Sequence, residues 1–196
     1  LDEYADHLRV VTTVESWSSD YSDFSRSNSL YVLDSSMKTV GKIENLAEGE
    51  GIKSARFMGE TGYFVTYKNT DPLFSVDLSD PENPKVLGEL KITGFSSYLH
   101  FYGENKLLGI GWETDPDTGN TIGMKCSMFD ISDPSDVKET DRFVLKDVSF
   151  CDALTNYRSI LAAPKKGLFG FAYGMYGSNS DIYDSSENFY YSIFSF

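Results

Sequence analysis

The chain has 196 residues and a formal charge of −13, from 30 aspartates and glutamates against 17 lysines and arginines. This charge repels the phosphate backbone of nucleic acids and anionic membrane surfaces, so we expect neither as a partner. Aromatic residues make up 15% of the sequence and favour the half-buried surface of a β-sheet, which indicates an all-β protein.

Short apolar runs separated by turn residues recur along the chain, and each run is typical of a β-strand. The runs form four successive groups, and the pattern is weaker in the last one. In chain order they lie at 8–14, 28–36 and 38–46; at 52–59, 62–68, 73–79 and 85–92; at 96–102, 106–112, 124–132 and 137–145; and within 149–196. No apolar run approaches the roughly 18 residues that a membrane-spanning helix needs, so we expect no membrane insertion of this segment.

One strand of each of the first three groups aligns with the others. Asp34, Asp77 and Asp130 then stand in register, 43 and 53 residues apart, and an insert after Trp112 accounts for the difference. A period of about 40 to 45 residues with four strands per unit is typical of β-propeller blades, and a β-sandwich is the alternative architecture.

We therefore predict a single all-β domain, a partial β-propeller of about three and a half blades with four antiparallel strands each. The blades lie at approximately 1–46, 52–92, 96–145 and 149–196, and the first lacks a run for its innermost strand. A closed ring usually has four to eight blades, so we expect either further sequence on both sides or self-association through open blade edges. The chain begins at Leu1 without a signal-like segment, which indicates a trimmed piece of a longer protein.

Several segments resemble a known family. LRVVTT, NSLYVLD, MFDISDP and the long run GKIENLAEGEGIKSARFMGETGYFVTYKNTDPLFSVDLSDPENPKVLGELKITGFSSYLH are similar to the secreted bacterial and archaeal β-propeller domain family, which is distantly related to WD repeats. The segment LFSVDLSDPENPKVLGEL also resembles the LVIVD-type repeat of surface proteins. The resemblance covers about residues 4–146 and implies an exported protein, extracellular or on the cell surface, with a propeller fold. It supplies no catalytic residues.

The motif DxSDP occurs twice, beginning at Asp77 and at Asp130. Asp and Ser side chains cap backbone N–H groups and Pro presets a turn dihedral, so each motif predicts a hairpin turn between the last two strands of a blade. Calcium binding by the repeated aspartates is the alternative. The insert from Asp115 to Asn120 has acidic residues at alternate positions but lacks the closing glutamate of a calcium loop, so we expect a polar turn there too.

No catalytic motif, metal site or cofactor fingerprint stands out. The sequence has no P-loop, dinucleotide fingerprint or Gly-x-Ser-x-Gly elbow, and His7 and His100 stand alone. Cys126 and Cys151 have no CxxC spacing, so they form either one disulfide or two small buried side chains.

Three connections between the second and third strands of a blade are long, at 15–27, 112–122 and 176–188. In a propeller they emerge on one face, beside the loop that holds Glu48 and Glu50. They are rich in aromatic and acidic residues, which suit a glycan or a basic protein segment. The candidate ligand-binding residues are Trp17, Tyr21, Trp112, Asp115, Asp117, Tyr176 and Tyr183, with Phe24 nearby.

We therefore expect a non-catalytic extracellular binding or scaffolding module that uses this loop face. The alternative interpretation of the same loops is that they are solvated and mobile and bind no ligand. The alternative function is an enzyme that acts on polysaccharide through a carboxylate site in the propeller channel.

Overall fold

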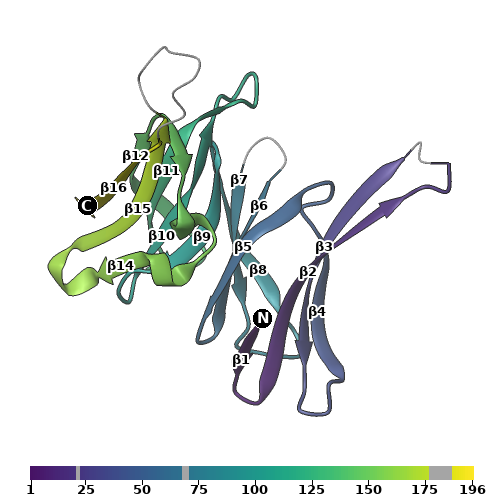
Figure 1. Cartoon of the computed structure of the whole chain (residues 1–196). Coiled ribbons are helices and arrows are strands. Elements are labelled where there is room, and N and C mark those ends of the chain that lie inside the picture. The colour runs from purple at the N-terminus through teal and green to yellow at the C-terminus, as the bar shows by residue number, and fades with distance from the viewer. Residues whose placement is uncertain (21–22, 68–70, 177–186) are drawn as a thin grey trace. The chain divides into compact units, whose positions relative to one another are not determined.

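The computed structural model describes residues 1–20, 23–67, 71–176 and 187–196 (Figure 1). Its strands form four antiparallel sheets that follow one another along the chain. Sheet 1 contains β1 (Asp2–Tyr4), β2 (His7–Trp17), β3 (Phe24–Leu33) and β4 (Thr39–Leu46); sheet 2 contains β5 (Gly51–Met58), β6 (Thr61–Tyr67), β7 (Asp71–Asp77) and β8 (Lys85–Ile92). Sheet 3 contains β9 (Phe95–Phe101), β10 (Lys106–Thr114), β11 (Thr121–Asp130) and β12 (Lys138–Leu145); sheet 4 contains β13 (Val148–Phe150), β14 (Ile160–Ala163), β15 (Leu168–Tyr176) and β16 (Glu187–Ser195).

The predicted all-β class and the four-stranded antiparallel unit are confirmed. Within the described residues the only helical segments are three short 3-10 turns, η1 (Asp152–Leu154), η2 (Tyr157–Ser159) and η3 (Pro164–Lys166). The sheets form because apolar and aromatic residues alternate with polar ones between turn residues, so each strand buries one row of side chains or two.

The first sheet has an inner strand that the sequence pattern did not predict. β1 pairs with β2 from Asp2↔Arg9 to Tyr4↔His7. Ala5 and Asp6 both take left-handed backbone angles, with φ of 49° and 60°, and close a two-residue hairpin turn. A polar three-residue strand such as Asp2–Tyr4 carries no apolar run, so only the pairing reveals it.

Sheet 4 departs from the regular meander. β13 and β14 both pair with one edge of β15, and β16 pairs with the other edge. The insert that holds η1 and η2 thus divides one inner strand position into two pieces.

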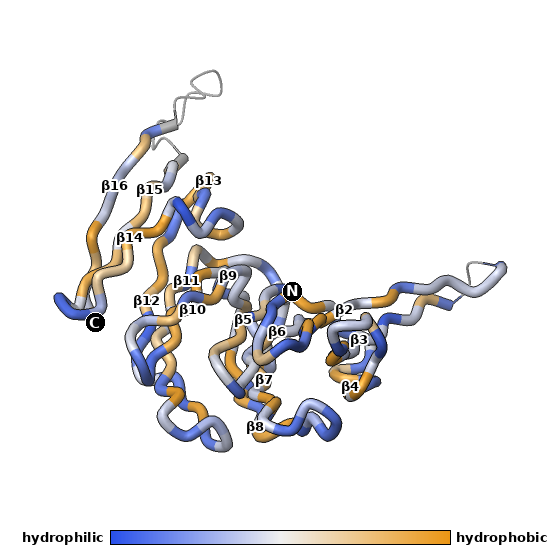
Figure 2. Tube along the Cα trace, turned by 90° about the horizontal axis from the view of Figure 1, so that it is seen from below, coloured by the Kyte–Doolittle hydropathy of each residue, from blue (hydrophilic) through white to orange (hydrophobic). Residues whose placement is uncertain are grey.

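The chain packs as two compact units. Unit 1 comprises residues 1–92 and 133–137, and unit 2 comprises residues 93–132 and 138–196. The core of unit 1 joins Leu30, Val32 and Leu46 of sheet 1 to Phe64, Phe74 and Val76 of sheet 2 and to Leu78, which comes directly after β7. The core of unit 2 joins sheet 3 to sheet 4, with Ile110, Cys126 and Met128 on one side and Phe169, Phe171 and Tyr173 on the other. Figure 2 shows hydrophobic residues along the central strands β6, β7, β10 and β11.

Glycines in the outer strands let turns approach closely within unit 1. A Cβ atom on Gly41 of β4 would collide with the carbonyl oxygen of Pro81 and lie 2.9 Å from Cδ of Pro84, both in the turn between β7 and β8. A Cβ atom on Gly88 of β8 would lie 2.9 Å from the carbonyl oxygen of Ser135. The two glycines repeat one packing device at equivalent places in successive outer strands.

Candidate functional site

A two-stranded arm extends from sheet 1. β2 and β3 stay paired as far as Trp17↔Phe24, whereas the pairing of β3 with β4 ends at Asn28↔Leu46. Residues 14–17 and 24–27 therefore form a hairpin without a third strand, which we call the hairpin arm (Figure 1). The sequence predicted a long loop at 15–27, but residues 15–17 and 24–27 are paired strand.

The tip of the arm exposes aromatic side chains. Trp17 is 59% exposed and Phe24 is 43% exposed, and their ring centroids lie 4.7 Å apart. The guanidinium of Arg26 lies 5.2 Å from the ring centroid of Phe24 and donates from Nη2 to Oε1 of Glu15 at 2.5 Å. The arm therefore presents an aromatic pair beside an ion pair, on a segment with no core of its own.

The base of the arm is anchored by Asn28, which is fully buried. Its Oδ1 accepts a hydrogen bond from the Thr13 hydroxyl at 2.6 Å, and its Nδ2 donates to the carbonyl oxygens of Leu46 at 3.0 Å and Glu50 at 2.9 Å. The backbone N–H of Gly49 donates to the carbonyl oxygen of Arg26 at 2.9 Å. These bonds join the arm to the loop that holds Glu48 and Glu50, as the sequence predicted for this face.

The connection between β10 and β11 is a compact polar turn. Oδ1 of Asp115 accepts from the backbone N–H of Thr118 at 2.8 Å, from its hydroxyl at 3.0 Å and from the backbone N–H of Asp117 at 3.0 Å. These bonds hold the pKa of Asp115 below its ordinary value. The carboxylate caps the turn, which is the structural role that the sequence favoured over calcium binding. Within the described ranges no three His, Cys, Asp or Glu side chains group as a metal site would need.

The other candidate residues divide into three kinds. Trp112 lies inside β10, pairs with Phe95 and Met124, and packs against the core of unit 2, so it belongs to a strand and not to the following loop. Tyr176 is the last residue of β15, and its side chain is not among those described. Tyr21 and Tyr183 lie outside the described residues. Among the residues singled out from the sequence, the structure places the exposed rings of Trp17 and Phe24 together.

Both DxSDP motifs form the predicted hairpin turns. Oδ1 of Asp77 accepts from the backbone N–H of Ser79 at 2.9 Å, and Oδ1 of Asp130 accepts from the backbone N–H of Ser132 at 2.9 Å. The serine side chains bond the same carboxylates, and these contacts lower the pKa of Asp77 and Asp130. The aligned Asp34 accepts from Ser36 in the same way, at 2.9 Å.

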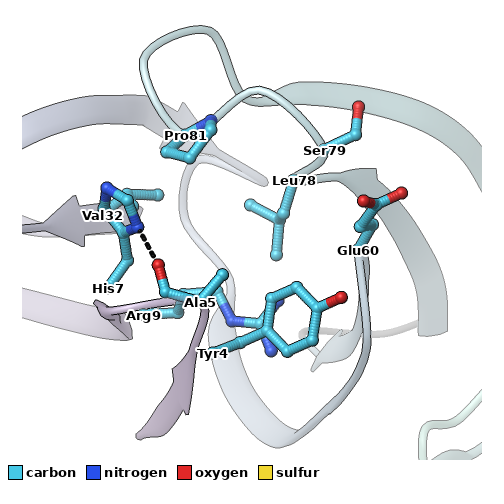
Figure 3. A pocket seen from close by; sticks show the side chains of 9 residues that line it. All are labelled: Tyr4, Ala5, His7, Arg9, Val32, Glu60, Leu78, Ser79 and Pro81. Atoms are coloured by element: carbon cyan, nitrogen blue, oxygen red, sulfur yellow. Dashed lines mark hydrogen bonds between the residues drawn. The ribbon is translucent and has the colours of Figure 1, made fainter.

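A small cavity in unit 1 escaped the sequence analysis. It has a volume of about 120 Å³ and lies between β1, β2 and the loops that hold Glu60 and Leu78 (Figure 3). Arg9 lines it and is 3% exposed, yet its guanidinium is already engaged by Asp2 and by the carbonyl oxygen of Gly59. The rings of Tyr4 and Phe57 lie 4.9 and 5.0 Å from the guanidinium carbon. In the sequence, the only sign of this buried ion pair was Arg9 itself, a charged residue within the apolar run LRVV.

The two cysteines are free and buried in unit 2. Burial raises the pKa of both thiols, and Sγ of Cys151 lies 3.4 Å from the carbonyl oxygen of Ala172. Of the two alternatives that the sequence left open, the structure therefore has two small buried side chains and not a disulfide.

No helix in the described ranges has the length and apolar character needed to cross a membrane.

Comparisons with known proteins agree with the fold. An uncharacterized protein of Archaeoglobus fulgidus is 45% identical over 177 residues, which cover 90% of this chain and 26% of that protein. An uncharacterized protein of Methanocaldococcus jannaschii is 44% identical over 169 residues, or 86% of this chain and 26% of that protein. The chain thus spans about a quarter of the length of these relatives. A family model described as a beta propeller domain matches residues 1–195, and the chain belongs to this beta propeller domain family.

Proposed function

We propose that the chain is a non-catalytic extracellular binding module that contacts a protein partner through the hairpin arm. The observation that carries this proposal is the exposed pair of Trp17 and Phe24 at the tip of the arm. Aromatic residues dominate the energetics of protein interfaces because they combine large contact area with few rotatable bonds. The extracellular location rests on the resemblance to secreted propeller proteins.

The charge of the chain points to a cationic partner surface. The formal charge is −13, and Glu15, Asp20 and Asp23 lie in or next to the arm. Ring faces attract cations, as the position of Arg26 over Phe24 illustrates. A lysine-rich or arginine-rich segment would meet both the aromatic pair and the surrounding negative potential.

The anchored base of the arm supports a binding role. Asn28 and Gly49 tie the base of the arm to the loop before β5, so this base is fixed before a partner arrives. Binding elements presented on a rigid scaffold lose less conformational entropy when the complex forms.

Tryptophan fluorescence tests the proposal. In a Trp112→Phe background, Trp17 is the single tryptophan, and titration with a lysine-rich peptide is expected to change its emission. The double variant Trp17→Ala and Phe24→Ala, followed by calorimetry, should bind the peptide about tenfold or more weakly, the scale of a two-residue aromatic hot spot. The matched control is Leu87→Ala on β8, since Leu87 is 38% exposed and distant in sequence from the arm.

Two results would contradict the proposal. One is unchanged peptide affinity after both aromatic residues are removed. The other is an arm-dependent signal on a glycan array without any peptide binding, which would assign the arm to carbohydrate. Release of reducing ends from a polysaccharide would contradict the non-catalytic assignment.

A further inference from the structure

Among the described residues, one face of sheet 4 belongs to neither of the two cores. Its other face contributes Phe169, Phe171 and Tyr173 to the core of unit 2. On the opposite face lie Phe189, Tyr191 and Ile193 of β16, which are 70%, 59% and 58% exposed. Leu161 of β14 and Phe150 of β13 lie on this same face and are 45% and 49% exposed. Five large apolar side chains on one sheet face are unusual for a surface that stays in water.

The face is hollowed beside Ala172 of its central strand, β15. The residues of β15 that point outward are Gly170, Ala172 and Gly174, because they pair with Ile193, Tyr191 and Phe189. Gly170 and Gly174 are buried, whereas Ala172 lines a hollow of about 390 Å³ together with residues that include Leu161 and Tyr191, and we call this hollow the trough. Such a trough accepts a row of medium-sized side chains from another surface.

The repeat shows what kind of surface covers such a face. In unit 1, the face of sheet 1 with Leu30 and Val32 packs against the next sheet. In unit 2, the face of sheet 3 with Ile110 and Cys126 packs against sheet 4. The exposed face of sheet 4 is the equivalent face, the one that a following sheet covers in both units. In both units the following sheet covers it with the face that is turned toward the preceding sheet, which we call the front face. The exposed face of sheet 4 therefore suits the front face of another sheet of this type.

The front face of sheet 1, which is the face turned away from sheet 2, has an apolar row that suits this role. Along β2, Leu8, Val10 and Val14 alternate with Arg9 and Val11, which face sheet 2. Tyr31 of β3 pairs with Val10 and lies beside this row. Leu8, Val10 and Tyr31 are partly buried and Val14 is 61% exposed, so the row forms an apolar ridge.

The charges of the two surfaces are complementary. In the described part of sheet 4 and its turns, residues 148–176 and 187–196, Arg158, Lys165 and Lys166 stand against two carboxylates, Asp152 and Glu187. In Figure 2 the turn between β14 and β15, which holds both lysines, is among the hydrophilic segments. On the side of the β2 ridge, sheet 1 carries exposed Glu3, which pairs with Leu8, while Glu44 is neutralised by an ion pair of 2.8 Å with Lys42. Opposite charges around an apolar contact favour one orientation of the two surfaces.

We propose that the exposed face of sheet 4 binds the front face of sheet 1 of a second copy of this chain. Such contacts are head-to-tail, since each copy contributes two different surfaces, the exposed face of sheet 4 and the front face of sheet 1.

Sedimentation equilibrium of the purified chain tests this interface between about 1 and 100 µM, a range of moderate protein affinities. The wild-type chain is expected to associate. Ala172→Arg fills the trough with a charged side chain at an exposed position and should weaken association about tenfold or more. Val14→Glu should weaken it from the other side. Leu87→Glu on β8 is the matched control, and circular dichroism verifies that each variant is folded.

A mixture of the two variants decides between pairing modes. An equimolar mixture of Ala172→Arg and Val14→Glu retains one intact front face and one intact trough, so it should recover a dimer that neither variant forms alone. A mixture that stays monomeric would overturn head-to-tail pairing. A monomeric wild-type chain, or an Ala172→Arg variant that associates like wild type, would overturn the interface itself.

Discussion

Aspartate is the residue that shapes the turns of this protein. Asp34, Asp77 and Asp130 each stand at the end of the third strand of their sheet and accept a hydrogen bond from the backbone N–H two residues later. Asp80 and Asp133 repeat the bond one turn further along, with Glu82 and Ser135. Each of these bonds closes a turn, so the repeated motif has a structural role in the fold.

Replacing Asp77 tests this role. Asp77→Ala should lower the thermal midpoint by about 2–4 °C, the shift expected for roughly one hydrogen bond in a chain of this size. Asp77→Asn keeps the accepting Oδ1 and should stay close to wild type. Scanning calorimetry of both variants measures the difference. Equal loss in the two variants would show that the charge, and not the hydrogen bond to Ser79, matters.

At the scale of elements, outer strands accept the turns of neighbouring hairpins. Gly41 of β4 leaves room for the turn that contains Pro81 and Pro84, and Gly88 of β8 leaves room for the turn that contains Ser135. The hydroxyl of Ser75 also donates to the carbonyl oxygen of Pro134. Each hairpin turn is thus both a local structure and a tertiary contact within unit 1.

Adding one methyl group at this contact should be costly. Gly41→Ala is expected to destabilise the protein by about 1–3 kcal/mol, because the new Cβ meets backbone atoms that have little freedom to move. The neighbouring Lys42→Ala is the control, since Lys42 is exposed and its side chain points away from the turn. Urea denaturation followed by fluorescence measures both changes. A Gly41→Ala variant as stable as wild type would contradict the close approach.

At the scale of the whole molecule, net charge governs how partners approach. A charge of −13 creates a negative potential over much of the surface, and that potential steers cationic partners and slows anionic ones. The proposed arm contact combines this long-range term with a short-range aromatic one. The proposed contact between copies must instead work against the net charge, which makes its apolar trough and local cations essential.

The two proposed contacts, of the arm with a cationic partner and of sheet 4 with a second copy, should respond differently to salt. Raising sodium chloride from about 50 to about 500 mM shortens the Debye length severalfold, so association of a lysine-rich peptide with the arm should slow. Self-association through sheet 4 should strengthen under the same change, because salt screens the repulsion between two acidic chains. Stopped-flow fluorescence follows the first process and sedimentation the second. Identical salt responses would argue against two distinct surfaces.

The sequence by itself determined the all-β class, the repeat of four strands and the aspartate turns. Each of these follows from local chemistry: alternating apolar residues, a period of 40 to 45 residues, and side chains that bond their own backbone. The buried state of Asn28 and Arg9 could not be read in this way. Both are polar residues within strands, and their partners at Glu50 and Gly59 are distant in sequence.

Only the tertiary structure decided which aromatic residues are available for binding. Trp17 and Trp112 stand at similar places in the sequence repeat, yet Trp17 lies on an arm without a third strand and Trp112 packs against a core. The exposed face of sheet 4 is a second case, since FYYSIF in β16 has the composition of a buried strand. Exposure depends on whether another sheet covers a side chain, and that is a property of packing between distant segments, which no local pattern encodes.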